Sequence, residues 1–78
     1  MKYIVYHTCN VEDVIIWSNH EMSHIEMATK LGVSERIIAG GYIEPKDRFC
    51  CGEAVSLGVR SRGFVDEDLI QNKYYKEM

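Results

Sequence analysis

The sequence predicts an α+β domain in which a mostly antiparallel sheet of about four strands packs against two helices, both on one of its faces. Three observations lead to this prediction. Short runs of β-branched and aromatic residues recur along the chain, two segments carry helix signals, and together they give the order β-β-α-β-β-α. With 78 residues, the chain has room for one domain with one core, over residues 1–78.

The first two strands are expected to form a hairpin. Lys2–Thr8 is rich in β-branched and aromatic residues and predicts a strand, and Cys9-Asn10 predicts a turn. Val14–Trp17 is a short apolar run that we interpret as the second strand. For Val11–Trp17 a helical turn capped by Asn10 is an open alternative.

A first helix is predicted over Ser23–Leu31. Ser23 and Glu26 have the spacing of a capping box, in which each side chain bonds the other residue's backbone amide. Apolar residues follow at helical spacing. Gly32 is placed to end the helix, and Lys30 lies near the negative end of the helix dipole.

The second half of the chain is expected to add two strands and a helix. Arg36–Ile43 has strand composition. A hairpin is expected between Tyr42–Glu44 and Phe49–Cys51, with a turn at Pro45–Arg48. In Asp66–Lys76 the acidic residues come first and the lysines last, which is the charge order that a helix dipole favours, so this segment predicts the second helix.

Composition excludes several classes of function. The net charge of −3 argues against binding to nucleic acid or to an anionic membrane surface. No long apolar run is present, so we expect neither a signal peptide nor a membrane span. The odd set of Cys9, Cys50 and Cys51 indicates reduced thiols in the cytoplasm. Their spacing fits no standard metal site, and no cofactor is expected.

The segment from Gly52 to Gly58 is the strongest candidate for a binding site. Glycines let backbone amides approach a ligand, and successive amides turned inward bind anions. Two arginines follow closely, and their planar guanidinium groups suit phosphate or carboxylate. The expected ligand-binding residues are Gly52, Ala54, Val55, Ser56, Leu57, Gly58, Arg60 and Arg62. The alternative is a simple turn beside surface ion pairs.

The segment Ser23–Ile70 resembles a family of small phage and bacterial proteins with a G-E-S-x-S-L-G loop, which is GEAVSLG in this chain. More remotely it is similar to the Janus family, the protein phosphohistidine phosphatases. There a helix with the catalytic histidine precedes a glycine-rich hairpin and a phosphate-binding loop. The resemblance implies that His24 is the catalytic histidine. It also implies that the protein, if phage-encoded, is located in the cytoplasm of the bacterial host. Ala54 replaces the loop serine, and the chain is shorter than the phosphatases, so some of their strands must be missing.

Three functions follow as alternatives. The first is a non-catalytic module that holds a phosphate-bearing, nucleotide-like small ligand in the loop; it ranks first because no second general acid or base accompanies His24. The second is a phosphohistidine-phosphatase-like enzyme in which His24 takes the phosphoryl group or activates water. The third is an adaptor for a host protein that uses an open sheet edge, which also favours a homo-oligomer. Apart from the resemblance, His24 is equally an exposed residue of a surface helix.

Overall fold

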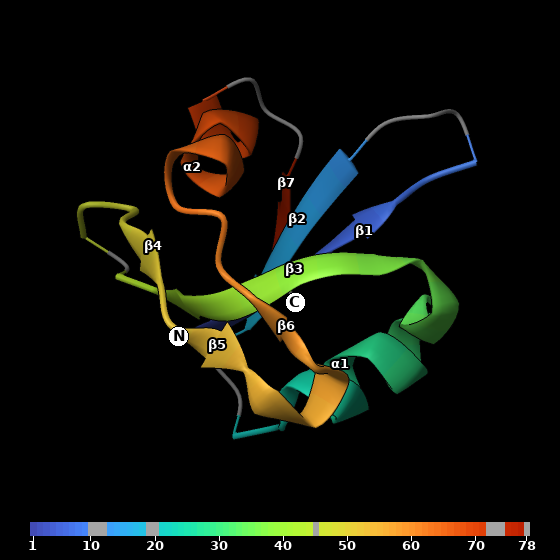
Figure 1. The fold of residues 1–78 in the computed structure, drawn as a ribbon. Coiled ribbons are helices and arrows are strands. Elements are labelled where there is room, and N and C mark those ends of the chain that lie inside the picture. The colour runs from blue at the N-terminus through green and yellow to red at the C-terminus, as the bar shows by residue number, and fades with distance from the viewer. Residues whose placement is uncertain (10–12, 19–20, 45, 72–74, 78) are drawn as a thin grey trace.

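Strand β1 (Lys2–His7) is the central strand of a five-stranded sheet in the computed structural model, which describes residues 1–9, 13–18, 21–44, 46–71 and 75–77 (Figure 1). It pairs antiparallel with β2 (Asp13–Ser18) on one side and with β3 (Ile37–Ile43) on the other. Beyond β3 lies β4 (Cys50–Cys51), also antiparallel. At the opposite edge, β7 (Tyr75–Glu77) runs parallel to β2. The α+β class and the four antiparallel strands are as predicted.

Helix α1 (His24–Leu31) begins and ends where the sequence predicts. The Glu26 amide donates to Ser23 Oγ at 3.1 Å, and the Ser23 amide donates to Glu26 Oε1 at 3.3 Å, so both bonds of the capping box form. Gly32 ends the helix in the left-handed conformation, with φ of 70°. A 3₁₀ turn, η1 (Ser34–Arg36), then leads into β3.

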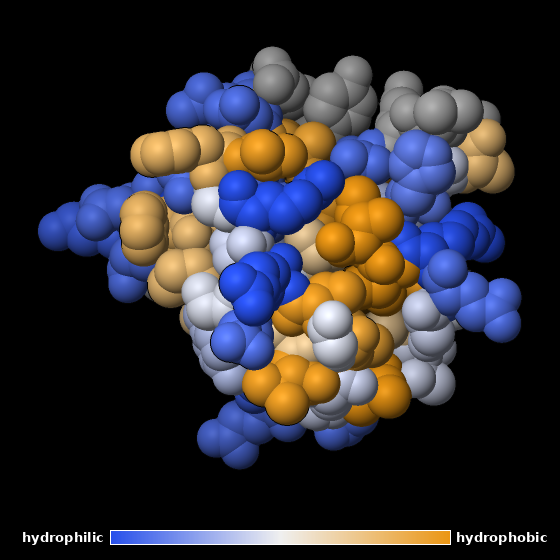
Figure 2. Space-filling view, viewed as in Figure 1, coloured by the Kyte–Doolittle hydropathy of each residue, from blue (hydrophilic) through white to orange (hydrophobic). Residues whose placement is uncertain are grey.

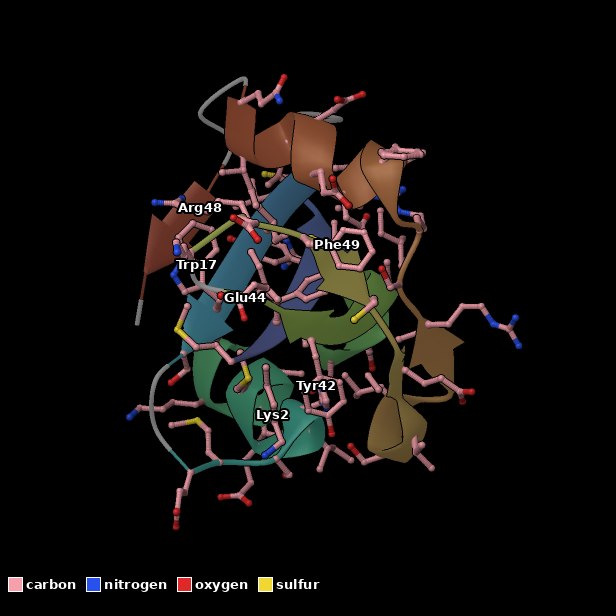
Figure 3. All side chains as sticks on the ribbon, turned by 90° about the vertical axis from the view of Figure 1, so that its left-hand side faces the viewer. Lys2, Trp17, Tyr42, Glu44, Arg48 and Phe49 are labelled. Atoms are coloured by element: carbon pink, nitrogen blue, oxygen red, sulfur yellow. The ribbon has the colours of Figure 1, made fainter. Side chains whose placement is uncertain are left out.

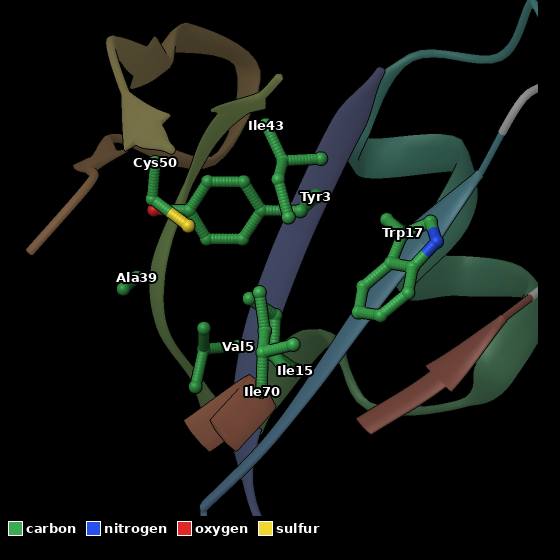
Figure 4. Packing of buried hydrophobic residues seen from close by; sticks show 8 residues of the cluster. All are labelled: Tyr3, Val5, Ile15, Trp17, Ala39, Ile43, Cys50 and Ile70. Atoms are coloured by element: carbon green, nitrogen blue, oxygen red, sulfur yellow. The ribbon is translucent and has the colours of Figure 1, made fainter. Parts of the chain in front are cut away.

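The two helices lie on opposite faces of the sheet, so the prediction that both share one face is wrong (Figure 1). Side chains alternate along β1, and its two faces belong to two separate cores. The core on the side of α2 (Phe64–Gln71), drawn in Figure 4, comprises Tyr3, Val5, Ile15, Trp17, Ala39, Ile43, Cys50 and Ile70. The core on the side of α1 comprises Ile4, Tyr6, Ile16, Met27, Ala28 and Val33. Burial on both faces explains why these strands are apolar without alternation.

The glycine-rich loop forms a small second hairpin. Strands β5 (Glu53–Ala54) and β6 (Val59–Arg60) pair antiparallel, and the 3₁₀ turn η2 (Val55–Leu57) joins them. This hairpin packs directly on β3, because a Cβ at Gly40 would lie 2.9 Å from the Cβ of Ala54. Glycine at position 40 therefore sets how closely the loop approaches the sheet.

The second helix differs from the prediction at both ends. It begins at Phe64 rather than Asp66, and it does not continue to Lys76, because Tyr75–Glu77 form a strand beside β2. The turn expected at Asn10 and part of the segment that includes Val11 lie outside the described residues, but Asp13–Ser18 is the predicted strand. Within the described ranges, no helix is long and apolar enough to cross a membrane.

Candidate functional site

His24, the first residue of α1, is buried, and only 4% of its surface is exposed. It is therefore not an exposed residue of a surface helix. Its Nε2–H donates to the carbonyl oxygen of Gly41 at 2.6 Å, which leaves the lone pair of the neutral ring on Nδ1. Nδ1 has no hydrogen-bond partner among the described residues, and it is not one of their fully buried unpaired atoms. One ring nitrogen thus fixes the imidazole, and the other has no partner among the described residues.

Burial lowers the pKa of His24 below its usual value of 6.5. The hydrogen bond to Gly41 acts in the opposite direction, and the positive charge of Lys2 lowers the pKa further. The imidazole is therefore neutral at pH 7. A neutral imidazole with a free lone pair is suited to act as a base or a nucleophile.

The loop presents two adjacent amides that the fold does not use. The Gly58 amide donates to the Val55 carbonyl at 3.1 Å, and the antiparallel pairing of Ala54 with Val59 occupies β5. In the part of the chain that the structure describes, neither the Val55 nor the Ser56 amide has an acceptor. Two successive free amides at the start of a helical turn form the kind of concavity that binds an anion.

Ser56 joins this loop to the start of α1. The Ile25 amide donates to Ser56 Oγ at 3.2 Å, across 31 positions of sequence. This bond holds η2 against the first turn of α1, the turn that begins with His24. The sequence predicted the loop and His24 separately, and the structure shows that they are neighbours.

Lys2 and Tyr42 complete the surroundings of His24, and sequence reasoning missed both. They are direct cross-strand partners on β1 and β3, and Figure 3 shows them side by side next to α1. The Tyr42 ring lies 5.3 Å from the His24 ring, centroid to centroid, at 90°. The positive charge of Lys2 acts on the imidazole, because it lowers the pKa of His24. Only the register of β1 on β3 brings these residues together, so no local pattern could have found them.

The two arginines of the predicted site lie elsewhere. Arg60 and Arg62 line a hollow that also includes Val55 and Gly58 of the loop, together with Ile38, Glu53 and Val59. Strands β5 and β6, which carry several of these residues, face the viewer in Figure 1 and, in the same view, in Figure 2. The side chain of Arg60 is exposed and leaves β6 opposite Glu53. Among the described residues, no hydrogen bond or ring contact joins either arginine to His24.

Arg62 is occupied by Asp66, which is fully buried. Asp66 Oδ1 accepts from Arg62 Nε at 2.7 Å, and Oδ2 accepts from the Arg62 amide at 2.8 Å. The Tyr3 hydroxyl also donates to Oδ2, at 2.6 Å, and Asp13 lies 3.6 Å from Arg62 Nη1. This network connects α2 to β1 and β2. It gives Arg62 a structural role.

The remaining residues of the predicted loop have packing or conformational roles. Ala54 is fully buried against β3, and Leu57 packs on the core beneath α1. Gly52 and Gly58 adopt φ values of 80° and 69°, which favour glycine. Comparison with family models, curated proteins and solved structures finds no match to this chain.

Proposed function

We propose that this protein binds a small phosphate-bearing ligand on the amides of Val55 and Ser56, beside His24. The observation that carries the proposal is the pair of adjacent unused amides, held against the first turn of α1 by the hydrogen bond from Ile25 to Ser56. Backbone donors fixed in this way bind an anion without reorganisation. The Ser56 hydroxyl keeps its own proton to donate, because its oxygen accepts from Ile25.

Local charge supports the same proposal. The chain carries a net charge of −3, so it does not attract anions as a whole. At this place, however, Lys2 and the positive end of α1 both favour a negative ligand. A phosphate group, with its several acceptor oxygens, matches amides, hydroxyl and ammonium together.

Binding is tested by titrating the protein with inorganic phosphate and with ribose 5-phosphate while recording backbone amide signals by NMR. We expect saturable shifts of the Val55 and Ser56 amides, and weaker binding after Lys2→Gln. The matched control is Lys46→Gln, since Lys46 is exposed on the β3–β4 turn. If the two amides do not respond at millimolar ligand, the proposal is wrong.

A second candidate is hydrolysis of a phosphorus–nitrogen bond, which the free Nδ1 of His24 favours. Nδ1 would attack phosphorus, and the bond between phosphorus and the substrate nitrogen would break, with that nitrogen taking a proton from solvent. Water would then displace the phosphoryl group from His24 and release inorganic phosphate. The loop amides would stabilise the charge on the phosphoryl oxygens.

The two candidates are separated by His24→Asn. For a binding module, the variant retains phosphate affinity, and neither protein releases phosphate from a phosphohistidine peptide. For an enzyme, the wild type releases phosphate and the variant does not, although it still binds. Release at equal rates by both proteins would exclude a catalytic role for His24.

A further inference from the structure

Tyr42 is an aromatic residue that the fold holds in place without burying. Its ring lies perpendicular to that of His24, and a Cβ at Gly52 would come within 3.0 Å of Tyr42 Cδ2. The ring is thus packed against His24 and Gly52. Even so, 46% of Tyr42 remains exposed. An ordered ring with an open surface, next to a phosphate site, is a platform on which a second planar group can stack.

We infer that Tyr42 stacks on the base of a nucleotide whose phosphate lies on the Val55 and Ser56 amides. This inference rests on the proposed function and names the class of ligand. His24 contacts the Tyr42 ring, and the amide of the next residue, Ile25, donates to Ser56, so the ring and the loop both contact the first turn of α1. The ribose of a nucleoside monophosphate separates base and phosphate, and it would lie along the first turn of α1.

Stacking suits this position better than hydrogen-bonded recognition of a base. The neighbours of Tyr42 across the sheet are Lys2 and Cys51, and neither carries an amide or carboxylate side chain that could pair with a base edge. A tyrosine face accepts any base, because every base has a π-surface. We therefore expect a preference for nucleotides over other phosphates, with little discrimination among bases.

The experiment compares AMP with ribose 5-phosphate, which has the same phosphate and sugar but no base. For the wild type we expect AMP to bind about ten-fold more tightly, as stacking on one aromatic side chain implies. Tyr42→Ala should remove this ratio while keeping the affinity for ribose 5-phosphate, and Tyr42→Phe should restore it. Isothermal titration calorimetry measures both ligands on each folded variant.

Phe49→Ala is the matched control. Phe49 is 52% exposed on the same hairpin, but Figure 3 shows it well apart from Tyr42, on the side of α2. Its removal should leave the ratio unchanged. Equal binding of AMP and ribose 5-phosphate by the wild type, or a ratio that survives Tyr42→Ala, would overturn the inference and leave the phosphate site standing. If neither ligand binds, the proposed function itself fails.

Discussion

The carbonyl oxygen of Gly41 lies 2.6 Å from Nε2 of His24. Strand β3 therefore fixes the side chain of the first residue of helix α1. This contact decides which ring nitrogen carries the proton and which is free. It also keeps the ring buried, and burial is the main cause of its lowered pKa. The position, tautomer and charge of the candidate catalytic group therefore depend on strand β3.

The protein should become less stable as pH decreases, because of His24. The folded state holds the imidazole at a pKa below 6.5, whereas the unfolded chain titrates near 6.5. Between these two values the unfolded state binds one more proton, so the free energy of unfolding should decrease as pH falls below about 6.5, by up to about 1.4 kcal/mol per pH unit. Above pH 6.5 this contribution is fully present.

Urea denaturation of wild type and His24→Gln at pH 7.5, 6.5 and 5.5 measures this effect. The other titratable groups are common to both proteins, so the difference between the two curves isolates His24. We expect the gap between wild type and variant to narrow as pH falls. Curves that stay parallel over this range would show that the folded pKa is not lowered.

The buried carboxylate of Asp66 should contribute strongly to stability. It accepts two hydrogen bonds from Arg62 and one from the Tyr3 hydroxyl. Asp66→Ala removes the acceptor of Arg62 Nε, of the Arg62 amide and of the Tyr3 hydroxyl, and we expect a loss of about 3–5 kcal/mol. Tyr3→Phe removes one bond to a charged group and should cost about 1.5–3 kcal/mol.

Chemical denaturation of these variants tests the network, with Asp47→Asn as the control. Asp47 is exposed in the β3–β4 turn, and its substitution should change stability by no more than about 0.5 kcal/mol. If Asp66→Ala costs as little as the control, the network does not hold α2 to the sheet.

Much of the fold can be predicted from local sequence signals. The wrong predictions concern elements that depend on contacts between residues far apart in the sequence. The capping box at Ser23 and Glu26 is local, and its prediction is confirmed. The strand at Tyr75–Glu77 depends on pairing with β2, about 60 residues away by position, so the charge order of the segment instead predicted a helix. The unbroken apolar run of β1 already indicated burial on both faces, and with it a helix on each side.

The residues of the candidate site also fall into two groups, those that local patterns predict and those that only long-range contacts bring together. The glycines of the loop and the cap before His24 are local patterns, so both parts were predicted. Lys2 and Tyr42 meet His24 only through the register of β1 on β3. Arg62 has the composition expected of a ligand-binding residue, but a buried Asp66 four positions later occupies it. A charge pattern alone cannot distinguish an arginine that binds a ligand from one that holds a helix.

The three cysteines should differ sharply in reactivity. Cys9 and Cys51 are exposed and free, whereas Cys50 is buried. Burial, aided by the charges of Asp66 and Glu67, raises the pKa of Cys50 to about 12, so its thiol stays protonated near neutral pH. With a colorimetric disulfide reagent at pH 8, we expect two thiols to react in the native protein and the third only after urea is added. Three fast thiols without denaturant would contradict the packing of Cys50 in the core.

Gly41 should be the glycine least tolerant of substitution. A Cβ there would overlap the carbonyl oxygen of Cys51 and lie 3.2 Å from the backbone of Gly52, so Gly41→Ala must push away β4 and the start of the loop. We expect a loss of about 3 kcal/mol or more, together with loss of phosphate binding. Gly58→Ala is the control: its Cβ would meet nothing within 4 Å, but its φ of 69° should cost about 1 kcal/mol. Urea denaturation compares the two, and a loss at Gly41→Ala no larger than that at Gly58→Ala would show that the close approach of β4 to β3 does not require glycine at position 41.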